Sequence, residues 1–487
     1  METTVATMIE ISEKEIRERL AFDNPWWRGK GINAGLEAYP RRFYYEEFYG
    51  LVQDLTVRRA VVLMGPRRVG KTVMAYHAIQ GLLDTGVPGD RIMFASLETP
   101  LYTGLALERL VRMFIAAHQH DDERQLYVFF DEVQYLKDWE VHLKSLVDSF
   151  RNVRFVVTGS AAAALKMKSE ESGAGRFTDF LLPPLTFAEY LRFIGREDEL
   201  IATCDRDDVC EAADIEALNA EFCNYLNYGG YPEAVFSERV RADSARYIKS
   251  DIIDKVLLRD LPILYGIQDI QELNRLFTTL AYNTGQEVTL EELSQSSGVA
   301  KNTLKRYLDY LEAAFLIRRV HKVDQNARRF KRVTSFKVYL TNPSMRGALF
   351  GYTEADGEAM GALCETAVYS QWLHSDAIRN LYYARWKQGE VDLVYLDPAG
   401  QRPTWAVEVK WSDRAKRTDD PAYKLVSFMT KTKVRAAGMV TTKTWRGERE
   451  IRGVPVQFRP AAELIYTLGK NIISMRSLTH ALARGGD

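Results

Sequence analysis

The sequence predicts a multidomain α/β protein with a parallel sheet in its N-terminal third. Its 487 residues are too many for a single hydrophobic core, so about three domains or more are expected. Over residues 58–160, short and almost continuous apolar runs alternate with helical patterns. This alternation is typical of a parallel sheet that helices cover on both faces. Because the first apolar run leads directly into the loop GPRRVGKT, we expect an anion-binding loop on this sheet.

Composition excludes a strongly basic protein and gives no overall attraction to nucleic acid. Apolar residues make up 46% of the chain and charged residues 27%, which is ordinary for a globular protein. The chain has 65 Lys and Arg against 66 Asp and Glu, so its net charge is −1. Any binding of nucleic acid must therefore come from local basic patches.

The cysteines and the N-terminus indicate a cytoplasmic protein. Cys204, Cys210, Cys223 and Cys364 show neither C-x-x-C spacing nor a zinc-site pattern with histidine, so free thiols in a reducing compartment are expected. The N-terminus lacks the apolar core of a signal peptide. Since no run of about 18 apolar residues occurs, neither a transmembrane helix nor a membrane partner is expected.

The loop Gly65–Thr72 has the spacing of a phosphate-binding loop and follows a predicted buried strand. Gly65 and Gly70 allow the tight backbone that turns amide groups toward phosphate oxygens. A helix starting near Lys71 adds its positive dipole end at the same place. Lys71 is expected to neutralise the β- and γ-phosphates of ATP, and Thr72 to bind Mg²⁺. The expected nucleotide-binding residues are Gly65, Pro66, Arg67, Arg68, Val69, Gly70, Lys71, Thr72 and Val73.

Two further strands of the predicted sheet end in polar residues. Asp131 and Glu132 follow the buried run LYVFF, at the end of a strand where ligands bind in open α/β sheets. We expect Asp131 to hold Mg²⁺ through water and Glu132 to polarise the attacking water. The strand VRFVVTGS places Thr158 within reach of the γ-phosphate or the attacking water, with Ser160 as the second choice.

Arg176 lies in the glycine-containing segment GAGRFTDF. An arginine in such a segment can stabilise the charge of a phosphoryl-transfer transition state, within its own chain or in a neighbouring subunit of an oligomer. The alternative, a surface arginine without a catalytic role, is equally compatible with the pattern.

The order of the motifs resembles a family of prokaryotic AAA-type ATPases that carry a nuclease-like C-terminal domain. The resemblance is carried by NPWW, GPRRVGKT, FFDEVQ, FVVTGS, GAGR, PLTFAEYL and GGYPEAV, and it covers essentially the whole chain. It implies an AAA-type ATPase core with a helical lid, then a winged helix, then a mixed α/β domain of the PD-(D/E)XK type. The expected boundaries are 1–50 for an N-terminal lead, 51–182 for the core, 183–268 for the lid, 269–332 for the winged helix and 333–487 for the nuclease-like domain.

Residues 289–320 predict a helix-turn-helix independently of this resemblance. Leucines repeat at helical spacing on either side of the turn SSGV. Lys301, Asn302, Lys305 and Arg306 would lie on the second helix, where a DNA reader needs them. The following segment 317–332 holds seven Lys and Arg and one acid, and we expect it to form a wing that follows phosphates. Winged helices also contact proteins, so a DNA partner and a protein partner both remain open.

The C-terminal region carries acids in the layout of a PD-(D/E)XK metal site. Asp392 lies in one predicted strand, and Glu408 and Lys410 lie in the next, so a hairpin brings them together. Glu365 lies on a preceding helix, and Glu390 is a candidate extra ligand because it lies two residues before Asp392 on the same strand face. Such carboxylates hold Mg²⁺, and the lysine positions water or neutralises the pentavalent phosphate.

Two hypotheses follow for the whole chain. In the first, ATP hydrolysis repositions the lid and drives C-terminal modules that act on DNA, with Mg²⁺ as the second cofactor. In the second, the chain is a signalling or assembly ATPase whose C-terminal domains bind protein partners. The nuclease-like domain is either an active enzyme or an inactive scaffold, because a fold alone does not establish an activity.

Overall fold

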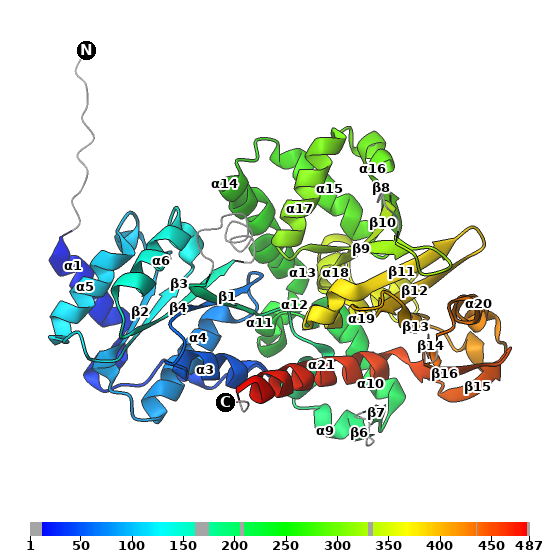
Figure 1. Cartoon of the computed structure of the whole chain (residues 1–487), viewed down its shortest axis with the longest axis horizontal. Helices are drawn as coiled ribbons and strands as arrows, with labels where there is room; N and C mark the ends of the chain where they lie inside the picture. The colour runs from blue at the N-terminus through cyan, green and yellow to red at the C-terminus, as the bar shows by residue number, and fades with distance from the viewer. Residues whose placement is uncertain (1–11, 161–174, 205–208, 330–334, 435, 485–487) are drawn as a thin grey trace, which may run out of the picture. The chain divides into compact units, whose positions relative to one another are not determined.

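The computed structural model describes residues 12–160, 175–204, 209–329, 335–434 and 436–484, and it describes side chains up to residue 472. The chain forms two compact units (Figure 1). The first comprises Met1–Gly65 and Gly70–Leu182, and the second comprises Pro66–Val69 and Pro183–Asp487. The further division of the second unit into lid, winged helix and nuclease-like domain stays a prediction.

The first unit is built on a five-stranded parallel sheet, which confirms the predicted α/β core. The strands Ala60–Gly65, Leu126–Asp131 and Val153–Ser160 are almost fully buried because helices cover both faces of the sheet, as their apolar sequences require. In spatial order the strands are β2 (Ile92–Ser96), β3 (Leu126–Asp131), β4 (Val153–Ser160), β1 (Ala60–Gly65) and β5 (Phe177–Leu181).

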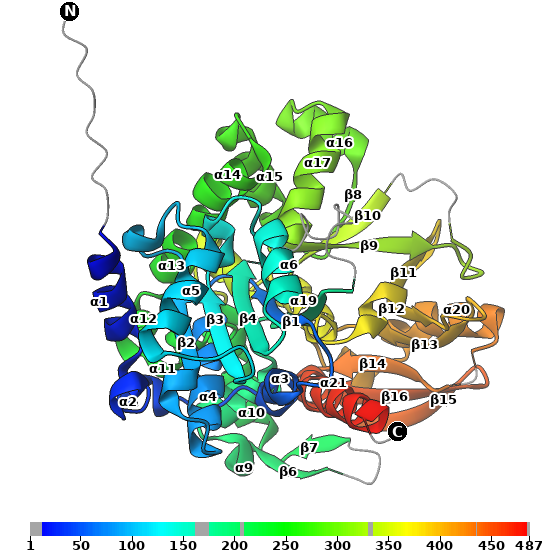
Figure 2. The same ribbon diagram turned by 60° about the vertical axis from the view of Figure 1, so that its left-hand side comes forward.

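One face of this sheet packs against α1, α5 and α6, which share a core with alternate strand residues such as Val62, Val128 and Val157 (Figure 2). α4 contacts β1 and β4 outside that core, which places it on the other face. The indole nitrogens of Trp26 and Trp27 both donate to the Ile92 carbonyl, so the N-terminal segment braces this unit. The helices are α1 (Glu13–Asp23), α2 (Ala34–Glu37), α3 (Tyr45–Gln53), α4 (Lys71–Asp84), α5 (Leu107–His118) and α6 (Trp139–Ser149).

The second unit contains a nine-stranded mixed sheet. The predicted domain boundary at residue 333 falls between strands of this one sheet. Strand β9, which precedes the boundary, pairs with β10 on one side and with β11 on the other, and both of these follow the boundary. In spatial order the strands are β15 (Gly447–Ile451), β16 (Val454–Pro460), β14 (Gly438–Thr442), β13 (Pro403–Glu408), β12 (Gly389–Leu396), β11 (Leu381–Trp386), β9 (Ile317–Val323), β10 (Ser335–Leu340) and β8 (Glu287–Thr289).

Residues 317–323 of the basic segment form β9, and a wing that follows phosphates stays a prediction. A strand with partners on both sides has its backbone groups committed to the sheet, and Arg319 is bound to Asp309 and Glu312. Residues 330–332 of the basic segment lie outside the described residues.

Helices cover the nine-stranded sheet around its β12–β14 region. α20 packs its apolar face on a core that includes Val394, Ala406 and Val440. α19 contacts β10 and lies beside the long C-terminal helix α21 (Figure 1). The bounds are α18 (Ser344–Phe350), α19 (Met360–Trp372), α20 (Tyr423–Thr432) and α21 (Ala461–Arg484).

The region predicted as a lid is helical except for one hairpin. β6 (Ile201–Cys204) and β7 (Cys210–Ala212) are antiparallel, and their register places Cys204 opposite Cys210. These two cysteines form a disulfide, whereas Cys223 and Cys364 are free and buried. The expectation of four free thiols is therefore wrong, because only the strand pairing reveals that Cys204 and Cys210 face each other.

The remaining helices of the second unit include the predicted helix-turn-helix. α16 (Leu290–Ser297) and α17 (Lys301–Ala313) are joined through Gly298, whose φ of 73° suits a glycine. No helix in the described part of the chain has the length and apolarity needed to span a membrane. The others are α8 (Phe187–Phe193), α9 (Glu197–Leu200), α10 (Ile215–Asn224), α11 (Pro232–Phe236), α12 (Glu238–Ala242), α13 (Ser244–Tyr247), α14 (Leu261–Tyr265) and α15 (Ile270–Tyr282), with π-helical turns at Tyr225–Gly229, Ile248–Asp254 and Val256–Asp260.

Candidate functional site

The carboxyl edge of the parallel sheet brings together residues from β1, α4 and β3. The Thr72 hydroxyl lies 3.1 Å from both carboxylate oxygens of Asp131. Lys71 is buried, and its Nζ donates to the carbonyl of Gly65 at 3.1 Å. Hydroxyl and carboxylate oxygens are the donors that Mg²⁺ prefers, so Thr72 and Asp131 fit such an ion.

The phosphate-loop backbone has the expected tight turn. Gly70 has a φ of 95°, which glycine tolerates without strain, and α4 begins at the next residue. Arg68 also has a positive φ, of 64°. Residues 66–69 group with the second unit, where Arg67 binds Asp260 in a bidentate ion pair with both N–O distances under 3 Å. Arg68 also has acidic partners there, Glu233 at 3.0 Å and Asp251 at 3.2 Å.

Glu132 is held by its neighbours on β4 and in the turn after β3. Its backbone has a φ of 58°, an uncommon conformation for a residue with a side chain. Its N–H donates to Thr158 Oγ1 at 3.1 Å, and the same hydroxyl donates to Asp131 at 2.5 Å. Gln134, which the sequence analysis missed, donates from Nε2 to the Glu132 carboxylate and accepts from the Ser160 N–H at 3.0 Å. Thr158 and Gln134 therefore fix both the backbone and the side chain of Glu132.

Asp131 carries an electrostatic cost in this arrangement. Burial raises its pKa to about 6, and the nearby charge of Glu132 adds to the rise. Hydrogen bonds from the neutral hydroxyls of Thr158 and Thr72 oppose the rise, and the charge of Lys71 opposes it least. The site therefore has a buried acid that a bound cation would stabilise in its charged form.

Arg176 is placed away from these groups. It comes immediately before β5, whose first residue, Phe177, pairs with Ala60 at the start of β1. The phosphate loop follows the opposite end of β1, because Gly65 is the last residue of that strand. The Arg176 side chain pairs with Asp148 at 2.6 Å. This geometry contradicts a catalytic role for Arg176 within its own chain; a role in a neighbouring subunit stays a prediction.

The second group of predicted site residues also comes together, inside the nine-stranded sheet. Antiparallel pairing of β12 and β13 brings Asp392 close to Glu408, and Asp392 Oδ2 accepts from the Val409 N–H at 2.9 Å. Glu365 reaches the same place from α19 and accepts from the Tyr339 hydroxyl. The structure therefore assembles the acid cluster, defined as Glu365, Glu390, Asp392 and Glu408.

Lys337 of β10, a residue that the sequence analysis missed, enters the centre of the acid cluster. Only 3% of its side chain is exposed. Its Nζ lies 2.7 Å from Glu365, 2.5 Å from Glu390 and 3.4 Å from Asp392. The sequence contained one indication of this role, because Lys337 is the only charged residue in the buried strand SFKVYL. Burying an unpaired ammonium group is costly, so a lysine in such a strand predicts acidic partners.

Lys410 approaches the acid cluster from the other side. Its Nζ lies 2.7 Å from Glu408 and 3.5 Å from Asp392, and 38% of its side chain is exposed. The other carboxylate oxygen of Glu408, Oε2, is buried and has no hydrogen-bond partner among the described residues. The strand predicted to contain both Glu408 and Lys410 ends at Glu408, and the Lys410 backbone N–H donates to the Thr441 hydroxyl.

Two lysines balance the charge of the acid cluster. Burial would raise the pKa of Asp392, but Lys337 and Lys410 outweigh burial and hold it below its ordinary value. Burial and the charge of Asp392 raise the pKa of Glu365 to about 7 and that of Glu408 to about 8. Near neutral pH these two glutamates therefore have a large protonated fraction, and the lysines compensate Asp392 and Glu390.

The acid cluster does not have the geometry of the expected metal site. In the described part of the chain, no three Asp, Glu, His or Cys side chains are arranged to hold a metal ion. The assignment of Glu365, Asp392 and Glu408 as metal ligands is thus not supported, because lysine nitrogens occupy the space between their oxygens.

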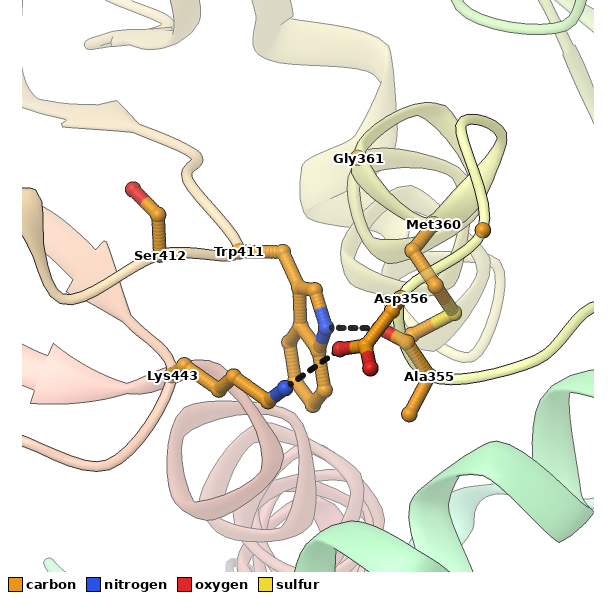
Figure 3. Close-up of a pocket in the computed structure, with 8 residues that line it drawn as sticks. Ala355, Asp356, Met360, Gly361, Trp411, Ser412 and Lys443 are labelled. Carbon is orange, nitrogen blue, oxygen red and sulfur yellow. Dashed lines mark hydrogen bonds and ion pairs between the residues drawn. The ribbon is translucent and has the colours of Figure 1, made fainter.

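A pocket of about 330 Å³ lies next to the start of α19 (Figure 3). The Trp411 indole donates to the Ala355 carbonyl, and Lys443 pairs with Asp356 across the opening. Met360 and Ser412 also line it. Every charged or indole group drawn here is engaged by a neighbour, so the pocket by itself defines no chemistry.

The face of α17 predicted to contact DNA is only partly available. Lys301 is paired with Glu291 at 2.5 Å. Asn302, Lys305 and Arg306 are exposed, and neither Lys305 nor Arg306 has an ion pair within the described residues.

Comparison with known proteins agrees with the first unit's architecture. Residues 57–191 match the AAA domain family, and residues 219–356 match a domain of unknown function. The parallel sheet, its phosphate loop and this match make residues 57–191 an AAA-type domain.

The relatives share much of this chain at low identity. An uncharacterized protein of Mycobacterium tuberculosis is 29% identical over 360 residues, 72% of this chain and 70% of its own. An uncharacterized protein of Haemophilus influenzae is 25% identical over 295 residues, which are 60% of this chain and 69% of the relative. An uncharacterized protein of Methanocaldococcus jannaschii is 22% identical over 68% of this chain and 71% of the relative.

Similar solved structures include the Aeropyrum pernix ORC1 protein in complex with DNA, at 12% identity and a TM-score of 0.31. The match covers 65% of this chain and 94% of the ORC1 chain. The replication initiator DnaA, bound to AMPPCP and single-stranded DNA, has 11% identity and a TM-score of 0.28 over 59% and 91% of the two chains. TM-scores of this size do not establish a common overall fold.

Proposed function

We propose that this chain is a Mg²⁺-dependent ATPase of the AAA type whose nucleotide state controls its C-terminal half. The observation that carries the proposal is Asp131, a buried carboxylate between the hydroxyls of Thr72 and Thr158, with Glu132 beside it. These groups lie at the carboxyl edge of a parallel sheet, directly beside a phosphate loop, which is where nucleotides bind in this architecture.

Each residue has a separate task in the proposed reaction. Lys71 would leave its contact with the Gly65 carbonyl and neutralise the phosphates. Thr72 and Asp131 would hold Mg²⁺, which supplies positive charge to the phosphate oxygens when bound. Glu132 would accept a hydrogen bond from the attacking water and orient it, while Gln134 and Thr158 keep Glu132 in place.

Two substitutions test this proposal by separating binding from turnover. Lys71→Ala should abolish ATP binding, measured with a fluorescent ATP analogue. Glu132→Gln should leave binding intact and lower phosphate release by about 10²-fold or more, because it removes the group that orients water. Glu123→Gln, an exposed acid in the same unit, is the matched control and should behave as wild type. Normal phosphate release by both Lys71→Ala and Glu132→Gln would refute the ATPase.

The phosphate loop also offers a route by which nucleotide could act on the second unit. Arg67 and Arg68 belong to the loop and bind acids of that unit, Arg67 through Asp260. A nucleotide that shifts the loop backbone would change these ion pairs. Asp260→Asn should therefore leave ATP turnover in place but remove any effect of ATP on proteolysis of the second unit. A wild-type effect that persists in Asp260→Asn would exclude this route.

The C-terminal half is proposed to contact DNA through α17. The exposed side chains of Lys305 and Arg306 on this helix favour that proposal. The double variant Lys305→Glu/Arg306→Glu should weaken DNA binding and reduce the slope of log affinity against log salt by about 2, one for each lost phosphate contact. Lys424→Glu, an exposed lysine on α20, is the control. Absence of wild-type DNA binding at low salt would favour the second candidate, an assembly or signalling ATPase with protein partners.

A further inference from the structure

The acid cluster lies where a nuclease-like domain would hold its metal, yet its centre contains an ammonium group. Lys337 Nζ is within 3.4 Å of three carboxylates that come from α19 and β12. The distances to Glu365 and Glu390 are those of strong charge-assisted hydrogen bonds. A divalent cation needs the same oxygens at about 2.0–2.6 Å, so the lysine and the metal cannot share them.

The surroundings of Lys337 hold it in place. Its side chain extends from β10, a fully buried strand, and its Nζ lies 5.4 Å from the centre of the Tyr383 ring. Tyr339, two residues further along the same strand face, donates to Glu365. Moving the ammonium out of the cluster would leave it buried without its three acidic partners, which is strongly unfavourable.

A series of alternating charges extends from this centre across the sheet. Glu390 also binds Arg385 at 2.9 Å, and Arg385 lies 3.6 Å from Glu287 of β8. Glu287 in turn binds Lys322 of β9 at 3.3 Å. Each acid on this path thus has a basic partner from another strand, and the path includes residues of β8, β9, β10, β11 and β12.

We infer that Lys337 is the resident cation of the acid cluster and takes the place of a divalent metal. The cluster then joins the strands of the second unit by internal ion pairs and does not carry out metal-dependent cleavage.

Titration with Mn²⁺ in the absence of nucleotide tests this inference on the full chain. Wild type and Asp392→Asn should show the same response of melting temperature to Mn²⁺, because the acid cluster offers no metal site. Binding of Mn²⁺ to wild type that Asp392→Asn abolishes would overturn the inference. ATP is omitted so that the result does not depend on the proposed ATPase activity. Any Mn²⁺ binding at the nucleotide site is recognised because Asp131→Asn removes it.

Replacement of the lysine gives the complementary measurement. Lys337→Met should lower the melting temperature by about 10 °C in metal-free buffer, because it leaves buried carboxylates without their partner. Mn²⁺ should restore part of this loss, and the double variant Lys337→Met/Asp392→Asn should not respond. Lys443→Met, which removes a surface ion pair, is the control and should change the melting temperature by no more than about 2 °C.

Two results of the second experiment would contradict the inference: a Lys337→Met protein as stable as wild type, or one that does not respond to Mn²⁺. If Lys337→Met fails to fold, the wild-type titration with its Asp392→Asn partner still decides whether the acid cluster binds metal.

Discussion

Asp131, the last residue of β3, and Asp392, in the middle of β12, are both buried aspartates, but their neighbours differ in charge. Asp131 meets the hydroxyls of Thr72 and Thr158, whereas Asp392 meets the ammonium groups of Lys337 and Lys410. Their pKa values accordingly shift in opposite directions, up to about 6 for Asp131 and below the ordinary value for Asp392. The comparison teaches that a buried acid indicates a cation site only when the protein does not supply the cation itself.

The same substitution at these two positions should therefore change stability with opposite sign. At pH 8 without nucleotide, Asp392→Asn should lower the unfolding free energy by about 3 kcal/mol, because the buried Lys337 and the partly exposed Lys410 lose a partner. Asp131→Asn should raise it by about 1–3 kcal/mol, because it removes a charge that burial disfavours. Denaturant unfolding measures both changes. A loss of stability in both variants would show that the two acids are equivalent.

Gln134 tests whether the first site depends on the positioning of Glu132. Gln134→Ala should lower ATP turnover by about 10²-fold with little change in ATP affinity, because Glu132 loses the side chain that holds it. Steady-state phosphate release and nucleotide titration separate the two effects. Gln125→Ala, whose side chain donates only to a backbone carbonyl, is the matched control. A drop in affinity with unchanged turnover would assign Gln134 to binding instead.

The acid cluster should also give the second unit a distinct pH dependence. The pKa of Glu408 is raised to about 8, so its neutral form is favoured in the folded state. The resulting stability is fully present below about pH 4.5 and is lost as the pH rises through about 8, by at most about 1.4 kcal/mol per pH unit. Glu408→Gln should flatten this part of the profile, measured as melting temperature from pH 5 to 9. If the profile of Glu408→Gln matches that of wild type, a group other than Glu408 is responsible for the pH dependence.

Local patterns were sufficient for the first unit. Short segments of sequence predict the phosphate loop, the strands beside it and the placement of Asp131, Glu132 and Thr158 at strand ends. Each of these predictions depends only on residues that are close together in the chain. In a parallel sheet each strand ends at the same edge, so residues that follow different strands must meet there. The exception is Arg176, because the strand β5 that follows it was not predicted, and without that strand Arg176 could not be assigned to the opposite edge of the sheet.

Long-range pairing limited the prediction for the second unit. The hairpin of β12 and β13 was predictable, and with it the approach of Asp392 to Glu408. Lys337 was not, because β10 reaches the acid cluster only through the packing of α19 and the order of a nine-stranded sheet. The disulfide of Cys204 and Cys210 was missed for a related reason, since it depends on the register of a short hairpin.

The sequence by itself determined an α/β core with a phosphate loop, the acids beside it, and a second set of acids near the C-terminus. Only the tertiary structure decided what each set of acids faces. The reason is physical: residue type establishes that a group can carry charge, but the pKa and partner of a buried group depend on atoms that are far away in the chain. Lys337 and Asp392, 55 residues apart in the sequence, meet only after the sheet has formed.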